Sequence, residues 1–378
     1  MTDRLSPGST VGIVGGGQLG RMLSAAAHRL GYRTAVLTGG AKDTPAGSVA
    51  DIEIALPFDD ETAVERLVAE SDVITWEFEN VDVRLADRAL ESGVAVHPSA
   101  QIVASAQDRR LEKLALVDAG APVAAWRPVD TILDWINAVD DLGTPAIAKT
   151  ARFGYDGKGQ VRINDKVAIE DAWGELAGEP AIIESVVDFT EEISVVVARG
   201  ADGSVVHHGV MQNDHVDHIL DTTTVPAAIA PHRATEAIAI AERIAETWQL
   251  VGVLCVEMFN TSDGLIVNEV APRPHNSGHC TLEAAPASQF EQQLRAICGL
   301  PLGDGECRPA AMVQLLGDLW ATGEPDWSRA LEFTDVHLHL YGKTEARPGR
   351  KMGHMTCLGT NPRDALATAL RAREALAR

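Results

Sequence analysis

Residues 268–279, NEVAPRPHNSGH, decide how the rest of the chain is interpreted. They begin inside the apolar run GLIVNEVA, residues 264–271, which predicts a β-strand that turns into a loop at two prolines. A carboxylate near a strand end, followed by arginine, asparagine and serine in a loop, can bind a cation beside an oxyanion. An ordinary strand with a polar loop has the same local sequence, so the remainder of the chain must distinguish the two.

The preceding run CVEMFNTSDGLIVNEVA, residues 255–271, predicts a β-hairpin that turns on Ser262-Asp263-Gly264. A three-residue loop with Gly264 in the left-handed conformation would place Glu257 opposite Glu269. Directly opposed β-carbons lie roughly 5 Å apart, where like charges are destabilising. A divalent cation would remove this repulsion, and Mg²⁺ favours carboxylates together with substrate phosphates. A two-residue turn at Asp263-Gly264 would instead place the acids on opposite faces, so the metal-site prediction requires the first register.

Residues 10–100 alternate short apolar strands with helical patterns, which predicts a parallel sheet covered by helices. The first turn contains GGGQLG, and its Gly15, Gly17 and Gly20 match the pattern of dinucleotide-binding proteins. A nicotinamide-binding protein also needs an acidic residue near the end of the second strand. That strand ends at Thr38-Gly39-Gly40, so the sequence disfavours a dinucleotide-dependent oxidoreductase.

The segment KTARFGYDGKGQ, residues 149–160, predicts a phosphate-binding loop. Its glycines would let backbone N–H groups approach phosphate oxygens, and Lys149 and Lys158 would supply positive charge. A flexible glycine hairpin with incidental lysines is the alternative.

Farther along, the strand AIIES ends near Glu184, and Glu192 follows it. Such a strand edge can contact adenine and ribose. An ordinary strand with exposed acids is an equal alternative.

The net charge of −22 disfavours general nucleic-acid binding, which requires a basic surface. An anionic substrate must therefore find its cations in a local pocket. The C-terminal segment YGKTEARPGRKMGH concentrates Lys343, Arg347, Arg350 and Lys351, which predicts an anion site, for example for a substrate phosphate, with a solvated basic loop as the alternative.

A length of 378 residues predicts two or three domains. The five cysteines lack the paired spacing of a zinc site, and their odd number favours reduced, buried thiols over disulfides. No apolar run approaches transmembrane length, and the first residues lack the pattern of a signal peptide. We therefore expect a cytoplasmic protein without a membrane partner.

Taken in order, five motifs make nearly the whole chain resemble the N5-carboxyaminoimidazole ribonucleotide synthetases of the ATP-grasp superfamily. They are GGGQLGRM, TWEFENV, KTARFGYDGKGQ, NEVAPRPHNSGH with SQFEQQLRAICGLPLG, and ARPGRKMGH. The resemblance implies an α/β fold that is α+β in its C-terminal half. Its units would be a Rossmann-like domain (residues 1–107), an ATP-grasp lid domain (108–187) and an antiparallel-sheet domain with the metal and substrate sites (188–378).

The resemblance also implies roles for individual residues. Mg²⁺ would be bound by Glu257 and Glu269. The ribonucleotide would contact Gln18, Glu77, Tyr155, Asp156, His275, Asn276, Ser277, Lys343, Arg350 and Lys351. ATP would contact Arg109, Lys149, Gly154, Tyr155, Asp156, Gly157, Lys158, Gly159, Gln160, Glu184, Ser185, Val186, Val187, Glu192, His215, Asn268 and Glu269. The chain departs from the family pattern at His218, where a glycine is expected.

The reaction implied by the resemblance is the ATP-dependent carboxylation of 5-aminoimidazole ribonucleotide with bicarbonate, through carboxyphosphate, in de novo purine biosynthesis. Arg273 and Lys351 would be catalytic, and the two-pronged guanidinium of Arg273 suits bicarbonate. A homodimer and a hand-over of the product to a separate mutase would accompany this function. The alternatives are a formate-dependent ribonucleotide transformylase of the same superfamily and a non-catalytic nucleotide sensor.

Overall fold

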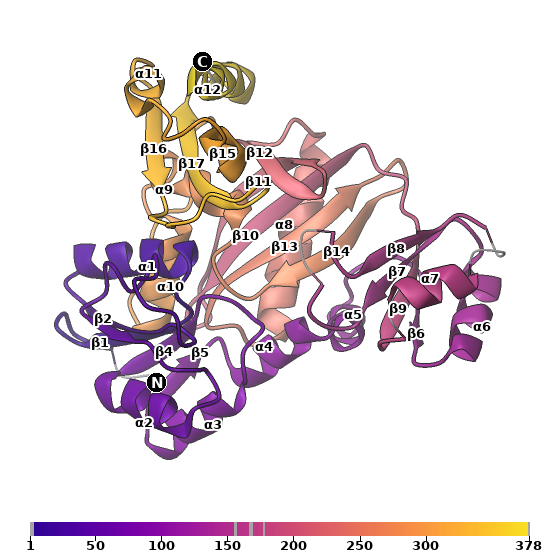
Figure 1. Cartoon of the computed structure of the whole chain (residues 1–378), viewed down its shortest axis with the longest axis horizontal. Coiled ribbons are helices and arrows are strands. Elements are labelled where there is room, and N and C mark those ends of the chain that lie inside the picture. Colours follow the sequence, from indigo (N-terminus) through magenta and orange to yellow (C-terminus); the bar gives the residue numbers. More distant parts are fainter. Residues whose placement is uncertain (1–3, 155–156, 166–168, 177, 377–378) are drawn as a thin grey trace.

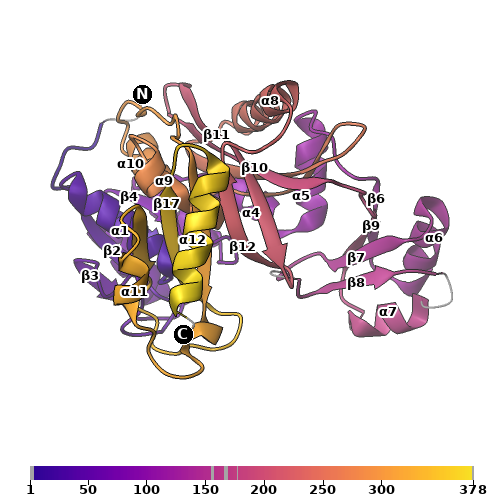
Figure 2. The same cartoon turned by 90° about the horizontal axis from the view of Figure 1, so that it is seen from above.

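The computed structural model describes residues 4–154, 157–165, 169–176 and 178–376, which form three β-sheets with flanking helices (Figure 1). We name them the N-terminal, central and C-terminal sheets in chain order. Seen from above, the central sheet and its helices stand apart at one side of the molecule (Figure 2). The fold is therefore mixed α/β, as the sequence predicts.

The N-terminal sheet is parallel and has the strand order β3-β2-β1-β4-β5. Strand β1 is buried along its whole length, because helices cover both faces of such a sheet. The elements are β1 (Thr10–Val14), α1 (Gln18–Arg29), β2 (Arg33–Leu37), β3 (Ile52–Ile54), α2 (Glu61–Glu70), β4 (Val73–Trp76), α3 (Arg84–Glu91) and β5 (Ala95–His97).

Two helices, α4 (Ala100–Gln107) and α5 (Arg109–Asp118), lead to the central sheet. Asp108 caps α5, since its carboxylate accepts a hydrogen bond of 3.0 Å from the backbone N–H of Arg110. The central sheet is antiparallel in the order β6-β9-β7-β8. Its elements are β6 (Trp126–Val129), α6 (Ile132–Leu142), β7 (Ala146–Thr150), β8 (Gln160–Ile163), α7 (Ile169–Glu175) and β9 (Ala181–Ser185).

The C-terminal sheet is antiparallel and has eight strands in the order β14-β13-β10-β11-β12-β15-β17-β16. Strands β12, β15 and β17 were not predicted from the sequence. The elements are β10 (Glu191–Arg199), β11 (Val205–Val216), β12 (Ile219–Val225), α8 (Pro231–Thr247), β13 (Gly252–Asn260), β14 (Leu265–Ala271), the 3₁₀ helix η2 (Asn276–Cys280), α9 (Thr281–Ala284), α10 (Gln289–Ile297), β15 (Ala310–Leu316), the 3₁₀ helix η3 (Gly317–Trp320), α11 (Trp327–Leu331), β16 (Val336–Leu340), β17 (Lys351–Leu358) and α12 (Pro362–Leu376).

The β13–β14 hairpin brings Glu257 opposite Glu269, as predicted, but by a different route. Next to the turn Asn260 pairs with Leu265, which is not the register that we expected from a three-residue loop. The register then shifts between Glu257 and Met258, so that Asn268 is the extra residue of a β-bulge. The predicted three-residue loop at Ser262-Asp263-Gly264 is therefore wrong. The irregularity lies at Asn268, beside the two carboxylates.

The turn between β11 and β12 explains why a glycine is expected at His218. Asp217 and His218 both adopt positive φ, at 49° and 65°. Glycine enters this region readily, whereas a residue with a Cβ is strained there. His218 therefore holds a conformation that favours glycine, and the turn still forms.

Helix α10 ties the N-terminal sheet to the C-terminal sheet through the buried amide of Gln293. Its Nε2 donates a hydrogen bond of 2.8 Å to Thr75 Oγ1 in β4. Its Oε1 accepts one of 2.6 Å from the backbone N–H of Val253 in β13. Phe290 and Leu294, on the same helix, belong to the apolar core around α1. One helix thus fixes the relative position of two sheets.

No helix among the described residues is long and apolar enough to cross a bilayer. All five cysteines are free thiols, and four of them are buried, as the sequence predicts.

Replacing Gln293 by Leu keeps the side-chain volume but leaves Thr75 Oγ1 and the N–H of Val253 without their partner. We expect the free energy of unfolding to fall by about 1–3 kcal/mol, the usual cost of stranded buried polar groups. Urea denaturation measures it. Gln101→Leu, at an exposed position of α4, is the control; equal midpoints for the two variants would contradict this role of Gln293.

Candidate active site

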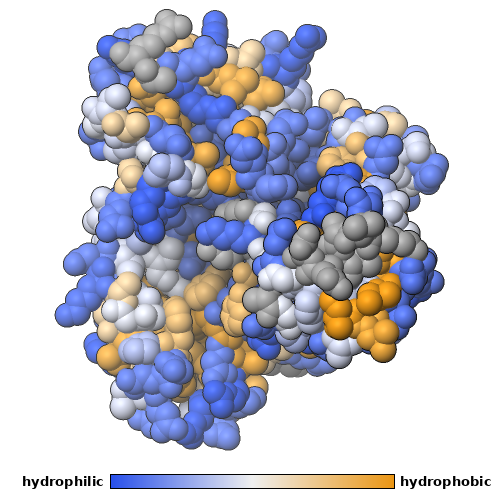
Figure 3. Space-filling view, turned by 45° about the vertical axis from the view of Figure 1, so that its right-hand side comes forward, coloured by the Kyte–Doolittle hydropathy of each residue, from blue (hydrophilic) through white to orange (hydrophobic). Residues whose placement is uncertain are grey.

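A polar cavity of about 540 Å³ lies where the three sheets approach one another. The face of the molecule drawn in Figure 3 is mostly hydrophilic, with hydrophobic residues in separate patches. The structure brings to this cavity most of the residues that the sequence singled out: Arg109, Lys149, Gly154, Gly157, Lys158, Gly159, Gln160, Glu192, His215, Glu257, Asn268, Glu269, Arg273, His275, Asn276 and Lys351.

A smaller cavity of about 160 Å³ is lined by Glu184, Ser185, Val186 and Val187 at the end of β9. It shares wall residues with the larger cavity, among them Phe189 and Phe259. These two rings stack with their centroids 4.5 Å apart. The smaller cavity is therefore a less polar extension of the larger one, with an aromatic wall that the sequence analysis did not identify.

A buried ion triplet joins α5 to the central sheet. The carboxylate of Glu184 lies 2.8 Å from Lys113 Nζ and 2.6 Å from Lys149 Nζ. Burial alone would raise the pKa of Glu184, but Lys149 and Lys113 lower it to about 2. The side chain of Glu184 is thus engaged by lysines. A ligand in the smaller cavity would therefore contact the backbone of β9 and the residues that follow it.

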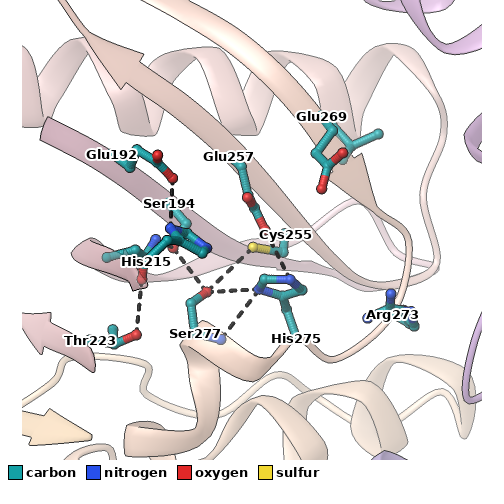
Figure 4. A network of polar contacts seen from close by, with 12 residues as sticks. Glu192, Ser194, His215, Thr223, Cys255, Glu257, Glu269, Arg273, His275 and Ser277 are labelled. Carbon is teal, nitrogen blue, oxygen red and sulfur yellow. Dashed lines mark hydrogen bonds and ion pairs between the residues drawn. The ribbon is translucent and has the colours of Figure 1, made fainter. Parts of the chain in front are cut away.

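The opposed carboxylates of Glu257 and Glu269 lie on the wall of the larger cavity (Figure 4). Arg109 Nη1 contacts Glu269 Oε2 at 3.1 Å. The bulge residue Asn268 accepts hydrogen bonds from two lysines, through its backbone oxygen from Lys113 at 2.8 Å and through Oδ1 from Lys149 at 3.4 Å. Two carboxylates and an amide oxygen form an all-oxygen donor set, which is the set that Mg²⁺ prefers. The residues present therefore fit the predicted metal.

His275 contacts the second carboxylate of this pair. Its Nε2 lies 2.9 Å from Glu257 Oε1, and its Nδ1 lies 2.9 Å from Ser277 Oγ. Burial raises the pKa of Glu257, whereas His275 lowers it to about 2. Burial lowers the pKa of His275, whereas Cys255 and Glu257 raise it. The backbone N–H of Ser277 also approaches Nδ1, at 3.3 Å, and opposes a proton there, so these contacts define the orientation of the ring rather than its charge.

Arg273 meets a carboxylate that the sequence analysis overlooked. Its Nε and Nη2 donate to the two oxygens of Glu79 at 2.6 and 3.1 Å, and Nη1 donates to the backbone oxygen of Pro274 at 3.2 Å. Burial raises the pKa of Glu79, but Arg273 lowers it overall. The guanidinium is thus held rigidly at the cavity wall by its own fork-shaped contact.

The glycine-rich first turn holds a carboxylate of the protein itself. Glu77 Oε1 accepts a hydrogen bond of 3.2 Å from the N–H of Leu19 at the start of α1. A Cβ at Gly15 or Gly17 would collide with the Glu77 side chain. These glycines therefore make room for a buried protein carboxylate at a helix N-terminus, a position that favours anions. This geometry, like the missing acid after β2, argues against a dinucleotide site.

Models of three protein families match the chain. They are a ribonucleotide synthetase preATP-grasp domain at residues 9–107, an ATP-grasp domain at 114–290 and a phosphoribosylaminoimidazole carboxylase C-terminal domain at 310–368. The N5-carboxyaminoimidazole ribonucleotide synthase of Bacillus subtilis is 43% identical over 352 residues, which cover 93% of this chain and 91% of that protein. The synthase of Brucella melitensis is 46% identical over 359 residues, covering 93% and 97%.

The chain belongs to the N5-carboxyaminoimidazole ribonucleotide synthase family.

Solved structures of this synthase family have the same fold. The crystal structure of an ADP complex of an N5-carboxyaminoimidazole ribonucleotide synthetase has a TM-score of 0.92 and 42% identity, covering 99% of this chain and 98% of that one. The Aspergillus clavatus synthase in complex with ADP and 5-aminoimidazole ribonucleotide has a TM-score of 0.88 and 30% identity, covering 98% and 99%. The predicted ATP-grasp fold is therefore confirmed.

Several residues that the resemblance to the synthases singled out do not line the two cavities. Lys343 Nζ donates to the backbone oxygen of Lys351 at 2.7 Å, and Arg350 Nη1 donates to that of Glu345 at 2.7 Å. Ser277 lies beneath the cavity wall, and Gln18 and Glu77 lie at the glycine-rich turn. Tyr155 and Asp156 fall outside the described residues. The roles assigned to all of these residues stay predictions.

Helix α5 contributes two more residues to the cavity walls, Glu112 and Lys113, which the sequence analysis missed. Glu112 and Lys113 are 3% and 1% exposed, whereas Leu111 and Leu114 are 49% and 57% exposed. Burial raises the pKa of Glu112 to about 7, and its carboxylate accepts a hydrogen bond of 2.9 Å from the N–H of Val270 in β14. The sequence contains a signal for this arrangement. In α5 two of the leucines lie on the exposed face and these two charged residues on the buried face, which reverses the usual amphipathic pattern of a helix.

The low pKa of Glu184 predicts a dependence of stability on pH. A carboxylate whose pKa falls from 4.5 to about 2 on folding stabilises the protein above pH 4.5. This contribution disappears as the pH falls towards 2. We expect the free energy of unfolding of the wild type to decrease over this range by up to about 3 kcal/mol more than that of Glu184→Gln.

Urea denaturation at a series of pH values measures this difference. Glu65→Gln, an exposed carboxylate on α2, is the matched control and should keep the wild-type dependence. If Glu184→Gln follows the wild-type curve as well, the ion triplet does not act as described.

Proposed function

We propose that this chain carboxylates 5-aminoimidazole ribonucleotide with bicarbonate and ATP, through carboxyphosphate, to give N5-carboxyaminoimidazole ribonucleotide, ADP and phosphate. The observation that carries the proposal is the single polar cavity in which lysines, opposed carboxylates and an arginine–histidine loop meet. Membership of the synthase family supports the choice of substrates. The reaction belongs to purine biosynthesis, and the enzyme is an ATP-dependent ligase.

The nucleotide would lie across the two connected cavities. Lys149, held by Glu184, and Lys158, in the glycine loop, supply compact positive charge for the phosphates. The smaller cavity, with residues 184–187 and the wall of Phe259 and Phe189, would take adenine, and Glu192 would take the ribose. His215 Nδ1 lies 2.7 Å from Glu192 Oε2 and orients that carboxylate.

Mg²⁺ would be held by Glu257 and Glu269 with Asn268 beside them. When bound, it neutralises charge on the transferring phosphoryl group. The chain prepares this position by opposing two carboxylates on one hairpin, with Arg109 and His275 as their present partners. Glu257 and Glu269 both line the cavity, so their oxygens would be accessible to the cation.

Bicarbonate and the acceptor would lie on the loop after β14. Arg273 is held by Glu79 and would orient the bicarbonate carboxylate, with Lys351 across the cavity as a second cation. The backbone of His275 is clamped at both polar groups by Gln289, at 2.8 and 2.7 Å, which makes this loop rigid. Preorganised charge in an enclosed cavity is the main contribution that such a protein makes to phosphoryl and carboxyl transfer.

Three properties predicted from the sequence belong to the same proposal. They are a cytoplasmic location, a homodimer and the hand-over of the product to a separate mutase. Each would be measured on the purified enzyme or in the cell, and none is needed for the chemistry of the cavity.

The proposal is tested by following ADP release with ATP and Mg²⁺ while the other substrates are varied. We expect release to require both bicarbonate and 5-aminoimidazole ribonucleotide, with N5-carboxyaminoimidazole ribonucleotide as the product. Release that is independent of the ribonucleotide, or that formate supports as well as bicarbonate, would overturn the assignment.

Replacing Glu269 by Gln removes one carboxylate of the opposed pair without changing its size. We expect kcat to fall by a factor on the order of 100, because charge stabilisation of the transferring phosphoryl group is lost. A steady-state assay over a range of Mg²⁺ concentrations measures it. Asp263→Asn, exposed at the turn of the same hairpin, is the control; a wild-type rate for Glu269→Gln would exclude this metal site.

A further inference from the structure

A line of buried polar side chains runs from β12 to the cavity across neighbouring strands (Figure 4). Thr223 Oγ1 donates to Asn213 Oδ1, Asn213 Nδ2 donates to Ser194 Oγ, and Ser194 Oγ donates to Ser277 Oγ, each at 2.9 Å. None of these four side chains is more than 5% exposed. Neither the family motifs nor the local sequence pointed to Thr223, Asn213 or Ser194.

The hydrogen bonds of this line all run in one direction. Ser194 Oγ accepts from an amide N–H, so its single hydrogen is donated to Ser277. Ser277 Oγ therefore accepts there and faces His275 Nδ1 at 2.9 Å, with Cys255 Sγ at 3.7 Å on another side. On the far side of the ring, His275 Nε2 meets Glu257 at 2.9 Å.

The line is not required by the fold of the sheet. Strands β10, β11 and β12 are neighbours, and apolar side chains fill most of their buried positions. Buried hydroxyl and amide groups add little net stability even when paired, and they cost free energy when one partner is lost. Four such groups in sequence, ending on a side chain of the cavity, therefore point to a role in the site.

We propose that Thr223, Asn213 and Ser194 are positioning residues, which fix the hydroxyl of Ser277 and through it hold the ring of His275 with Nε2 facing Glu257. The inference rests on the proposed function, because His275 belongs to the loop assigned to the acceptor. A histidine ring that turned over would withdraw its contact from Glu257 and disturb the carboxylate that would hold Mg²⁺. The line thus links the positions of β10, β11 and β12 to the orientation of the His275 ring in the cavity.

Ser194→Ala and Thr223→Val interrupt the line at two places, and Thr223→Val keeps the side-chain volume. We expect Ser194→Ala to lower kcat for ribonucleotide-dependent ADP release about tenfold, because it removes a hydrogen bond close to the ring. Thr223→Val should lower kcat about threefold, because the hydrogen bond that it removes is farther from the ring. The KM for ATP should stay at the wild-type value. Thr223→Ser, which restores a hydroxyl, should recover most of the rate lost in Thr223→Val.

The matched control is Thr222→Val on the same strand. Thr222 is 5% exposed, and its hydroxyl donates to Asp214 at 3.0 Å, outside the line. We expect wild-type kinetics from this variant. A loss of rate as large as that of Thr223→Val would show a general effect of removing a buried threonine hydroxyl and would overturn the inference.

A second readout does not depend on turnover. Nuclear magnetic resonance of protein labelled with ¹⁵N-histidine reports the environment of each ring nitrogen, and His275→Gln assigns the signals. Ser194→Ala should shift the Nδ1 and Nε2 signals of His275, whereas Thr222→Val should not.

Unchanged His275 signals in Ser194→Ala would overturn the positioning role whatever happens to the rate. If instead the wild-type enzyme shows no ribonucleotide-dependent ADP release, the proposed function fails. The nuclear magnetic resonance result then still decides whether the line orients His275.

Discussion

Two carboxylates that face each other across a β-hairpin impose the constraint on which the site depends. Glu257 and Glu269 are a direct cross-strand pair, an arrangement that repels in the absence of a cation. The protein meets it with a separate partner for each carboxylate, the ring of His275 from the loop after β14 and the guanidinium of Arg109 from α5. The contacts that offset this repulsion therefore join the hairpin, the loop and α5.

The remaining charges of the cavity follow the same rule. Lys113 and Lys149 share Glu184, and Arg273 is held by Glu79, so cations in this acidic protein are fixed by buried carboxylates. Burying an ion pair costs desolvation, so the pair adds little stability compared with apolar residues of similar volume. What the arrangement provides is charge that is already oriented when anionic substrates arrive, and this preorganisation is the larger part of electrostatic catalysis.

Much of the fold and of the site could be predicted from local patterns. Alternating strands and helices indicated the parallel sheet, and glycines with lysines indicated the loop at residues 154–160. The partners of these residues could not be predicted, because Glu79 and Arg273 are far apart in the chain and neither segment indicates the other. The anion beside the glycines of the first turn could not be predicted for the same reason, since Glu77 comes from the end of another strand.

The sequence by itself determined which chemical groups this protein has and the alternation of strands and helices in residues 10–100, because those depend on residues that are neighbours in the chain. It also indicated that Glu257 and Glu269 belong together. Only the tertiary structure decided how they meet, through a bulge at Asn268 and not at the turn, because the register of a hairpin responds to packing beyond it. The same holds for residues 268–279, whose partners come from α5, from the segment after β4 and from β10, and become neighbours only when the sheets are joined.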